Sequence, residues 1–386
     1  MSKTYTSSYS SGLTLTAQYS LLASTAAVHD TQTSGIAIAG PSGTAWTLTN
    51  EGRISATGTN GYGVSFATAG TVMNSGSING GSFVNLTTYV VGVGIDLSGG
   101  GAITNQSGGV ITGTTTGIKL PNGGTVDNQS GGTINASQTQ YRSGVAIAAY
   151  DVATVVNAGD IKRSDIYLAH GGLVSNQSGG TIGNIEIANS YSPHYTPNAT
   201  ATILNAGYLS DLIDPITGIA SNAAGGTIGL VQMQQGTLAV STLVNAGVLP
   251  SGVIFGPNGV VSNQSGGIID GPAGFGVGMY GGTLINAGRI SASNFLSDDF
   301  GVEADKTSGV WLTNQSSGTI IAGIGIYSTH STSGAFTAVN AGYIKGTAGD
   351  GIRLVNEAAS LTNQAGGVIK GSTTLSNLLS DIPISW

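Results

Sequence analysis

The clearest regularity in the chain is an apolar residue placed two positions before an Asn, a pattern that recurs fourteen times. Residues two apart on a β-strand face the same side, so each of these Asn side chains shares the face of an apolar neighbour, as in the pair Val155 and Asn157. The pattern therefore predicts fourteen short strands that turn an Asn inward. The fourteen positions are Asn50, Asn74, Asn105, Asn128, Asn157, Asn176, Asn205, Asn222, Asn245, Asn263, Asn286, Asn314, Asn340 and Asn363.

The segment after each Asn has two lengths. In the short form the next Ile or Leu stands four residues after the Asn, as in Asn157 to Ile161, and in the long form it stands six residues after, as in Asn176 to Ile182. The two forms differ by two residues, so the inward side of the following strand is preserved, whereas a difference of one would reverse it. From Asn128 to Asn363 long and short forms alternate, which fits either a two-coil evolutionary unit or better stacking of unlike turns.

The spacing of the Asn residues predicts a solenoid. Successive Asn residues lie 17 to 31 residues apart, and the mean of about 24 is the length of one coil of a β-solenoid. Many coils open with a further motif of Gly, apolar, any residue, apolar, as at Gly35, Gly92, Gly117, Gly144, Gly323 and Gly351. We therefore expect three short strands per coil, stacked in parallel at about 4.8 Å, and no helices.

A buried Asn without a partner destabilises a fold by about 1–3 kcal/mol. When Asn residues stack in successive coils, each amide can donate to the carbonyl oxygen of the next, and the chain of hydrogen bonds satisfies the buried groups together. The sequence therefore predicts an inward Asn ladder as a structural element.

Several segments resemble the β-strand repeats of bacterial autotransporter passenger domains and of filamentous-haemagglutinin-like exoproteins. They read TLTNEGRISA, ITNQSGGVITG, LINAGRISAS and LTNQAGGVIKGS, and the resemblance covers residues 35–375. It implies an all-β, right-handed parallel β-helix, here of about fourteen coils, together with secretion and usually adhesion. Residues 1–34 and 376–386 are expected to be terminal segments that cap the helix or mediate assembly. No C-terminal membrane barrel is expected, because only about ten residues follow the last coil.

Composition narrows the function. Only 8% of the residues are charged, the net charge is −7, and the 11 Lys and Arg residues form no cluster, so nucleic acid is not an expected partner. There is no Cys, which excludes disulfides and thiolate metal sites and fits export of an unfolded chain. No segment has the roughly 18 apolar residues of a membrane helix, and the N-terminus has no Sec-type apolar segment, so we expect no membrane insertion.

No catalytic, cofactor-binding or metal-binding residue is expected. Glycoside hydrolysis needs two carboxylates that face one groove, and the best pair, Asp298 and Asp299, is adjacent on the chain and so points to opposite faces. The other acids are scattered and the His residues lack the spacing of a zinc motif. Five Asn-Gln-Ser sequons coincide with predicted ladder residues and are expected to be inward. A polysaccharide lyase or hydrolase is therefore the least favoured of three functions.

The two better functions are a structural subunit and an adhesin. Insertions at 80–91, 189–200, 208–218 and 293–300, with several Tyr residues, offer loops that can bind a carbohydrate or a cell-surface ligand, or simply pack on themselves. Both termini contain very few charges, so they are poor blocks against strand pairing with another copy. We therefore expect an extracellular or cell-surface protein that forms head-to-tail homopolymers. The predicted assembly contacts are Leu13, Leu15, Leu378, Leu379, Ile382, Ile384 and Trp386.

Overall fold

The computed structural model describes most of the chain. The described residues are 2–81, 92–137, 144–187, 199–213, 217–233, 241–272, 274–292, 299–305, 308–329, 335–355, 359–371, 375–377 and 384–385. Two compact units divide the chain, Met1–Ala201 and Thr202–Trp386. The described residues form β-strands and turns without any helix, and their strand pairs are parallel, as in β6 with β9 and β26 with β29. The chain is thus an all-β parallel β-helix, as the sequence predicts.

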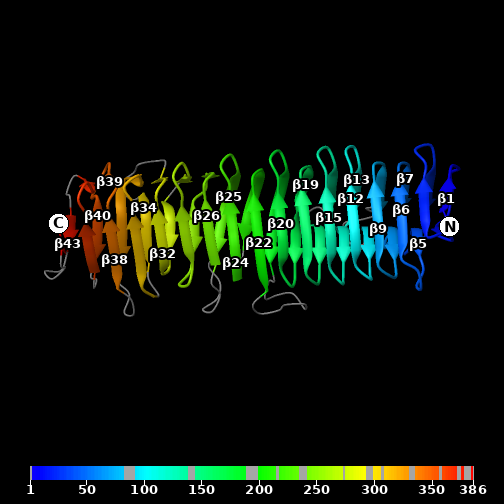
Figure 1. Ribbon diagram of the computed structural model, residues 1–386, viewed down its shortest axis with the longest axis horizontal. Coiled ribbons are helices and arrows are strands. Elements are labelled where there is room, and N and C mark those ends of the chain that lie inside the picture. Colours follow the sequence, from blue (N-terminus) through cyan, green and yellow to red (C-terminus); the bar gives the residue numbers. More distant parts are fainter. Residues whose placement is uncertain are drawn as a thin grey trace. The chain divides into compact units, whose positions relative to one another are not determined.

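One class of strand ends at each of the fourteen Asn residues, and we call its members ladder strands. In the N-terminal unit they are β6 (Trp46–Asn50), β9 (Gly70–Asn74), β12 (Gly101–Asn105), β15 (Gly124–Asn128), β18 (Ala153–Asn157) and β20 (Gly172–Asn176). In the C-terminal unit they are β22 (Thr200–Asn205), β24 (Thr217–Asn222), β26 (Ser241–Asn245), β29 (Val260–Asn263), β32 (Gly282–Asn286), β35 (Val310–Asn314), β38 (Phe336–Asn340) and β41 (Ala359–Asn363). Figure 1 shows β6, β9, β12 and β15 side by side in chain order.

A second class of strand follows the turn after each Asn, and β4 (Ala27–Asp30), which follows the turn after Leu22, is its equivalent in the first coils. The other members are β7 (Arg53–Ala56), β10 (Ser77–Gly80), β13 (Val110–Gly113), β16 (Thr133–Ala136), β19 (Asp160–Leu168) and β21 (Thr181–Ile187) in the N-terminal unit. In the C-terminal unit they are β23 (Tyr208–Ile213), β25 (Thr227–Met233), β27 (Val248–Leu249), β30 (Ile268–Gly271), β33 (Arg289–Ala292), β36 (Thr319–Ala322), β39 (Tyr343–Gly346) and β42 (Val368–Lys370).

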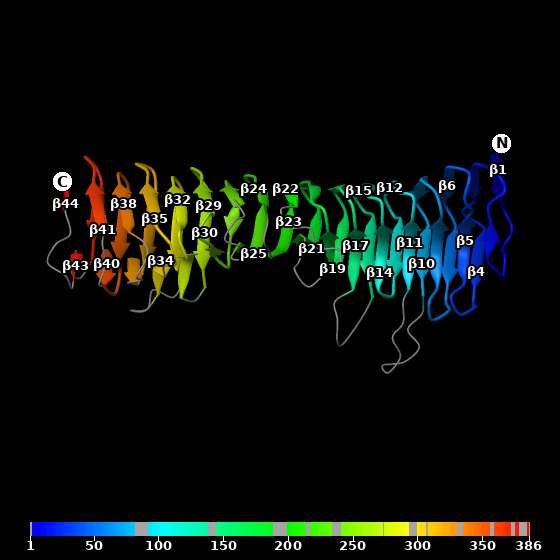
Figure 2. The ribbon, with the colours of Figure 1, turned by 90° about the horizontal axis from the view of Figure 1, so that it is seen from below.

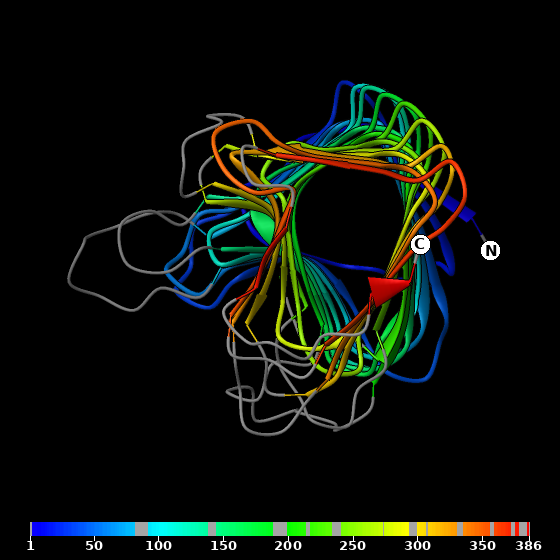
Figure 3. The same ribbon diagram turned by 90° about the vertical axis from the view of Figure 1, so that its left-hand side faces the viewer.

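The third class comprises the Gly-apolar motifs and their equivalents. These strands are β2 (Leu13–Thr14), β5 (Ile36–Gly40), β8 (Tyr62–Phe66), β11 (Val93–Leu97), β14 (Thr116–Leu120), β17 (Val145–Ala149), β28 (Val253–Phe255), β31 (Phe275–Met279), β34 (Phe300–Asp305), β37 (Ile324–Thr329), β40 (Ile352–Val355) and β43 (Leu375–Asn377). Figure 2 shows β12 and β15 beside one another, with β10, β11 and β14 on a different side of the coils. Viewed along the stack, the coils of a unit lie one behind another (Figure 3).

The expectation of three strands per coil is wrong for part of the chain. In β19, β21, β23 and β25 the second and third strands are continuous, and β19 pairs with β16 through its first residues and with β17 through its last. The sequence differs here, because residues 157–250 contain no motif of Gly, apolar, any residue, apolar, whereas Gly252 and Gly274 begin such motifs where the two strands are separate again. Without the close backbone approach that such a Gly allows, the chain bends through a register shift between Ile161 and Asp165.

The two turn lengths preserve the inward side, as the sequence predicts. Ile161 follows a short turn and Ile182 a long one, yet the two are direct partners in the register of β19 and β21, and neither is exposed. The long turn places Gly179 at a φ of 83°, a backbone conformation that a side chain would oppose. The two extra residues are therefore accommodated at the corner and do not disturb the next strand.

Two terminal strands precede the ladder. They are β1 (Ser2–Tyr5) and β3 (Tyr19–Leu22), which pair with each other, and β3 pairs in turn with β6. A last short strand, β44 (Ile384–Ser385), pairs with β41. Segment 1–34 thus contributes parallel strands to the first coils, and the stack extends beyond the repeats at 35–375.

Candidate functional site

The Asn ladder is the most extensive polar feature of the interior. Thirteen of the fourteen Asn residues are at most 2% exposed, and Asn363, in the last ladder strand, is half-buried. In the N-terminal unit the side-chain amides are linked from Asn50 to Asn176, and in the C-terminal unit from Asn205 to Asn363, with Nδ2 to Oδ1 distances of 2.7–2.9 Å. The predicted ladder is confirmed, and the inward Asn of each sequon is buried.

Each ladder amide also serves the turn that follows it. Asn263 donates to Oδ1 of Asn286 at 2.9 Å and to the carbonyl oxygens of Gly267 and Arg289, both at 3.2 Å. Its own Oδ1 accepts from Nδ2 of Asn245 at 2.8 Å. One side chain therefore joins two neighbouring Asn residues and two turns, which gives a physical reason for the Asn at this position in all fourteen ladder strands.

The ladder stops where the residue type changes. In the first coils, Leu22 is the register partner of Asn50, and a Leu side chain offers no amide. Accordingly, Oδ1 of Asn50 is buried and has no hydrogen-bond partner among the described residues. The ladder thus ends inside the stack at Asn50, and its amide groups have a structural role.

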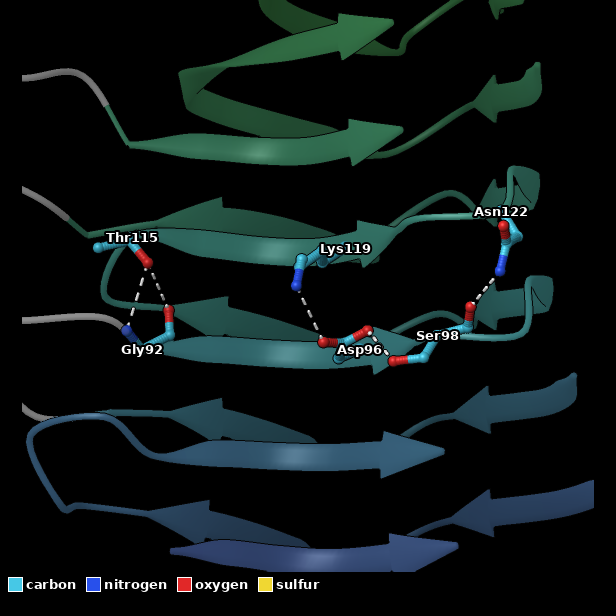
Figure 4. Close-up of polar contacts among 6 residues, drawn as sticks. All are labelled: Gly92, Asp96, Ser98, Thr115, Lys119 and Asn122. Atoms are coloured by element: carbon cyan, nitrogen blue, oxygen red, sulfur yellow. Dashed lines mark hydrogen bonds and ion pairs between the residues drawn. The ribbon is translucent and has the colours of Figure 1, made fainter. Parts of the chain in front are cut away.

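A group of polar contacts joins two neighbouring coils on the outer side of β11 and β14 (Figure 4). Lys119 Nζ lies 3.3 Å from Oδ2 of Asp96, its register partner, and Ser98 Oγ donates to Oδ1 of Asp96 at 3.1 Å. Asn122 Nδ2 donates to the carbonyl oxygen of Ser98 at 2.6 Å. Asp96 is buried and fully engaged, so this group stabilises the coil contact and presents no open carboxylate for chemistry.

The acidic pair considered for catalysis is only partly described. Asp298 lies outside the described residues, and Asp299 is 4% exposed, with Oδ1 accepting from the backbone amide of Gly274 at 3.1 Å. Asp299 thus binds backbone in the adjoining coil. This structural role was not predicted, because the sequence places Asp299 in a loop and carries no signal that its carboxylate faces an amide of another coil.

One shallow pocket lies on the outer side of β28, β31 and β34. It is lined by Ile254, Phe275, Gly278, Met279, Tyr280 and Glu303, and its volume is about 90 Å³. Ligand pockets are usually about 300–1,000 Å³, and glycoside hydrolysis usually needs a second carboxylate, whereas Glu303 is the only acidic residue in this lining. The pocket therefore offers a small half-apolar contact and lacks the two-carboxylate geometry.

The remaining candidate groups are separate. His170 lies 3.5 Å from Asp151, His29 is exposed on β4, and His194 and His330 fall outside the described residues. Within the described part of the chain, no group of three His, Asp or Glu residues is arranged to hold a metal ion. The same residues contain no helix of the length and apolarity needed to cross a membrane.

At the N-terminal end, the predicted assembly contacts divide into two kinds. Leu13 is half-buried, although its register partner Ile38 is completely buried, so this inward column opens to solvent in the first coil. Leu15 is 2% exposed and packs in the interior of its own coil, so it offers no surface to another copy.

The C-terminal end shows the same opening. Ile344 is completely buried, whereas its register partner Ile369 on β42 is half-buried. Among the described residues β42 pairs only with β39, so its other edge has no described partner. Leu378, Leu379, Ile382 and Trp386 lie outside the described residues, and Ile384 is placed on β44 as the register partner of Leu361.

The insertions at 80–91, 189–200 and 293–300 lie mostly outside the described residues, whereas the first part of the insertion at 208–218 forms strand β23 and not a loop. Of the Tyr residues near the insertions, Tyr191 and Tyr195 are not described, and Tyr208 on β23 is 48% exposed. Comparisons with protein-family models, with curated proteins and with solved structures give no match.

Proposed function

We propose that the chain is a non-enzymatic, extracellular structural protein that assembles head to tail. The observation that carries the proposal is the open state of the inward column at both termini, at Leu13 and at Ile369. In the interior the same columns are fully buried, so a further coil stacked on either end would bury these side chains in the same way. The resemblance to secreted β-helix exoproteins and the absence of Cys support an extracellular location.

The charge of the termini supports the same proposal. Lys3 is the only charged residue among the first 28, and its Nζ lies 4.8 Å from the ring centre of Tyr5. Asp381 is the only charged residue among the last 16. Soluble β-proteins usually protect exposed strand edges with charges or Pro, and these ends carry little of either protection. Contact between two unlike ends does not close on itself, so it yields an open filament.

The experiment compares an inward and an outward lysine in one strand. Leu13→Lys places a charge in the inward column of β2, and Thr14→Lys places the same charge on the adjacent, exposed position. We expect filaments of the intact protein in negative-stain images, filaments of Thr14→Lys, and monomers of Leu13→Lys and of Ile369→Lys. Light scattering that shows only monomers of the intact protein at high concentration, over a range of pH and with Ca²⁺ added, would refute end-to-end assembly. An adhesin that binds through its loops would then replace it.

A further inference from the structure

The ladder strands present a second regular pattern on their outer side. Their outward side chains stand three and one residues before each Asn, and we call this surface of the C-terminal unit the ladder face. Before short turns the order is Thr and then an apolar residue, as in Thr242 and Val244, and before long turns it is reversed, as in Val260 and Ser262. From β22 to β38 the order alternates without exception through seven strands.

The strand register turns this alternation into a checkerboard. Thr242 pairs with Val260 and Val244 with Ser262, and one coil further Val260 pairs with Thr283 and Ser262 with Ile285. Every apolar side chain on the ladder face therefore has a hydroxyl residue beside it in the next coil. The periodic mixture explains why no block of consecutive apolar residues marks this surface in the sequence.

The ladder face carries no charge. None of the ladder strands β22 to β41 contains Asp, Glu, Lys or Arg, whereas the other strands of the same unit carry Asp270, Arg289, Lys345 and Arg353, among others. Because the whole chain has a net charge of −7, two copies repel each other on average. The ladder face is the side of this unit on which that repulsion is weakest.

The face also exposes large apolar side chains. Leu204 is 43% exposed, Ile219 50% and Trp311 55%, which are large values for apolar residues in the middle of a sheet. The Trp311 ring leans toward Gly309, the residue before its strand, where an added Cβ would come within 3.0 Å of the ring. Flat sheet faces of this kind pack on other sheets at about 10 Å.

We propose that the ladder face is a pairing surface for a second copy of this chain. A partner that stays in register over seven coils must present its contact groups at the same spacing as the coils. A second copy of the chain does so, because it has the same coils. A two-fold axis along β29 places short-turn coils opposite short-turn coils, so apolar residues meet apolar residues throughout. Val260 then meets Val260, Val244 meets Ile285, and exposed Ile219 meets exposed Trp311. This contact lies on a different surface from the proposed end-to-end contact.

Its strength follows from its size. Seven coils at about 4.8 Å span roughly 34 Å, and two outward side chains per strand give a width of about 12 Å, so each copy contributes roughly 400 Å². Both copies together bury about 800 Å², which is below the roughly 1,200 Å² of a standard stable interface. A single pair of faces therefore gives a weak, concentration-dependent dimer.

The test uses the full chain with its ends blocked, Leu13→Lys combined with Ile369→Lys, so that only face contacts remain. We expect sedimentation to show a monomer–dimer equilibrium between micromolar and millimolar concentration. Val260→Lys would place two ammonium groups on the two-fold axis and weaken the dimer at least about tenfold. The matched control is Ile321→Lys on β36, another half-buried outward aliphatic position, which should leave dimerisation unchanged.

A second measurement does not depend on a charged variant. Because the chain has no Cys, Val260→Cys introduces a single thiol, and we expect a short bis-maleimide to cross-link it into a dimer, while Ile321→Cys remains monomeric. A monomer at all concentrations, or cross-linking at both positions alike, would overturn the inference. A different result would also overturn it: the blocked chain forms no dimer but binds a soluble neutral oligosaccharide, and Trp311→Ala abolishes this binding. The ladder face would then be a carbohydrate-binding surface.

Discussion

Replacing one interior Asn by Leu is the most direct test of the ladder, since Leu has a similar volume and no amide. In Asn263→Leu, the donor to Asn286 Oδ1 disappears, and so does the acceptor for Asn245 Nδ2. The amide of Asn245 keeps two other acceptors, the carbonyl oxygens of Gly247 and Ile268. Oδ1 of Asn286, by contrast, loses its ladder donor inside a residue that is completely buried.

The expected cost follows from this difference. One buried acceptor left without its donor destabilises a fold by about 1–3 kcal/mol. The carbonyl oxygen of Gly267 still accepts from the backbone amide of Arg289 at 2.9 Å, so the turn keeps its backbone hydrogen bond. Added apolar burial of Leu offsets part of the loss. We therefore expect the free energy of unfolding to fall by about 1–3 kcal/mol.

The matched control is Asn363→Leu. Asn363 is half-buried, accepts from Asn340 Nδ2 at 2.8 Å and donates to the carbonyl oxygen of Gly367 at 3.0 Å, and among the described residues no ladder Asn follows it. We expect less than about 1 kcal/mol there, because water can replace the lost partner. Urea unfolding followed by circular dichroism measures both variants, provided that the slope with urea stays constant. Equal losses at positions 263 and 363, or none at 263, would show that the ladder does not stabilise the fold.

Two further predictions use the same elements. Asn263→Asp keeps the acceptor for Asn245 but sets a second acceptor against Asn286 Oδ1, and both this contact and burial raise the pKa of the new carboxyl above its unfolded value of about 3.9. The stability of this variant should therefore be highest at low pH and should fall as the pH rises from the unfolded pKa to the folded pKa. Urea midpoints that are constant with pH would contradict this. Deleting Ser178 and Gly179 together should keep the fold, because it converts a long turn to a short one. Deleting Gly179 alone should turn the next strand over, expose Ile182, Ile185 and Ile187, and lower the stability by roughly 5 kcal/mol or more. Thermal unfolding measures both deletions, and equal stability of the two would contradict the parity argument.

The interior could be predicted from the sequence because each inward position repeats with the same chemistry. Asn at the end of a ladder strand and Ile after either turn occupy the same site in every coil, so the pattern reveals the coil, the inward side and the ladder together. The continuous strands β19, β21, β23 and β25 and the buried carboxylate of Asp299 were not predicted, because each depends on one coil and its neighbour and has no repeated signal.

Outward positions are harder to interpret, since their meaning depends on the register between coils. Thr242 and Val260 are 18 residues apart and carry no visible relation in the sequence, yet they are direct neighbours on the ladder face. In the sequence, the alternation of turn lengths is a property of the corners alone. Its consequence for the outer face, where the order of polar and apolar residues reverses with each turn type, follows from the strand register.

The two proposed contacts have different symmetry, and this difference fixes what they build together. End-to-end contact joins unlike surfaces and remains open, so it adds copies without limit. The two-fold contact of the ladder face joins two identical surfaces, so it is complete when two copies have paired and adds no third copy. Copies held in a filament present their ladder faces as a repeated array, so many weak contacts act together and strengthen pairing without any new interface. The expected product is therefore a filament of paired chains with limited width, and added salt, which screens the net negative charge while leaving the neutral face unaffected, should favour it.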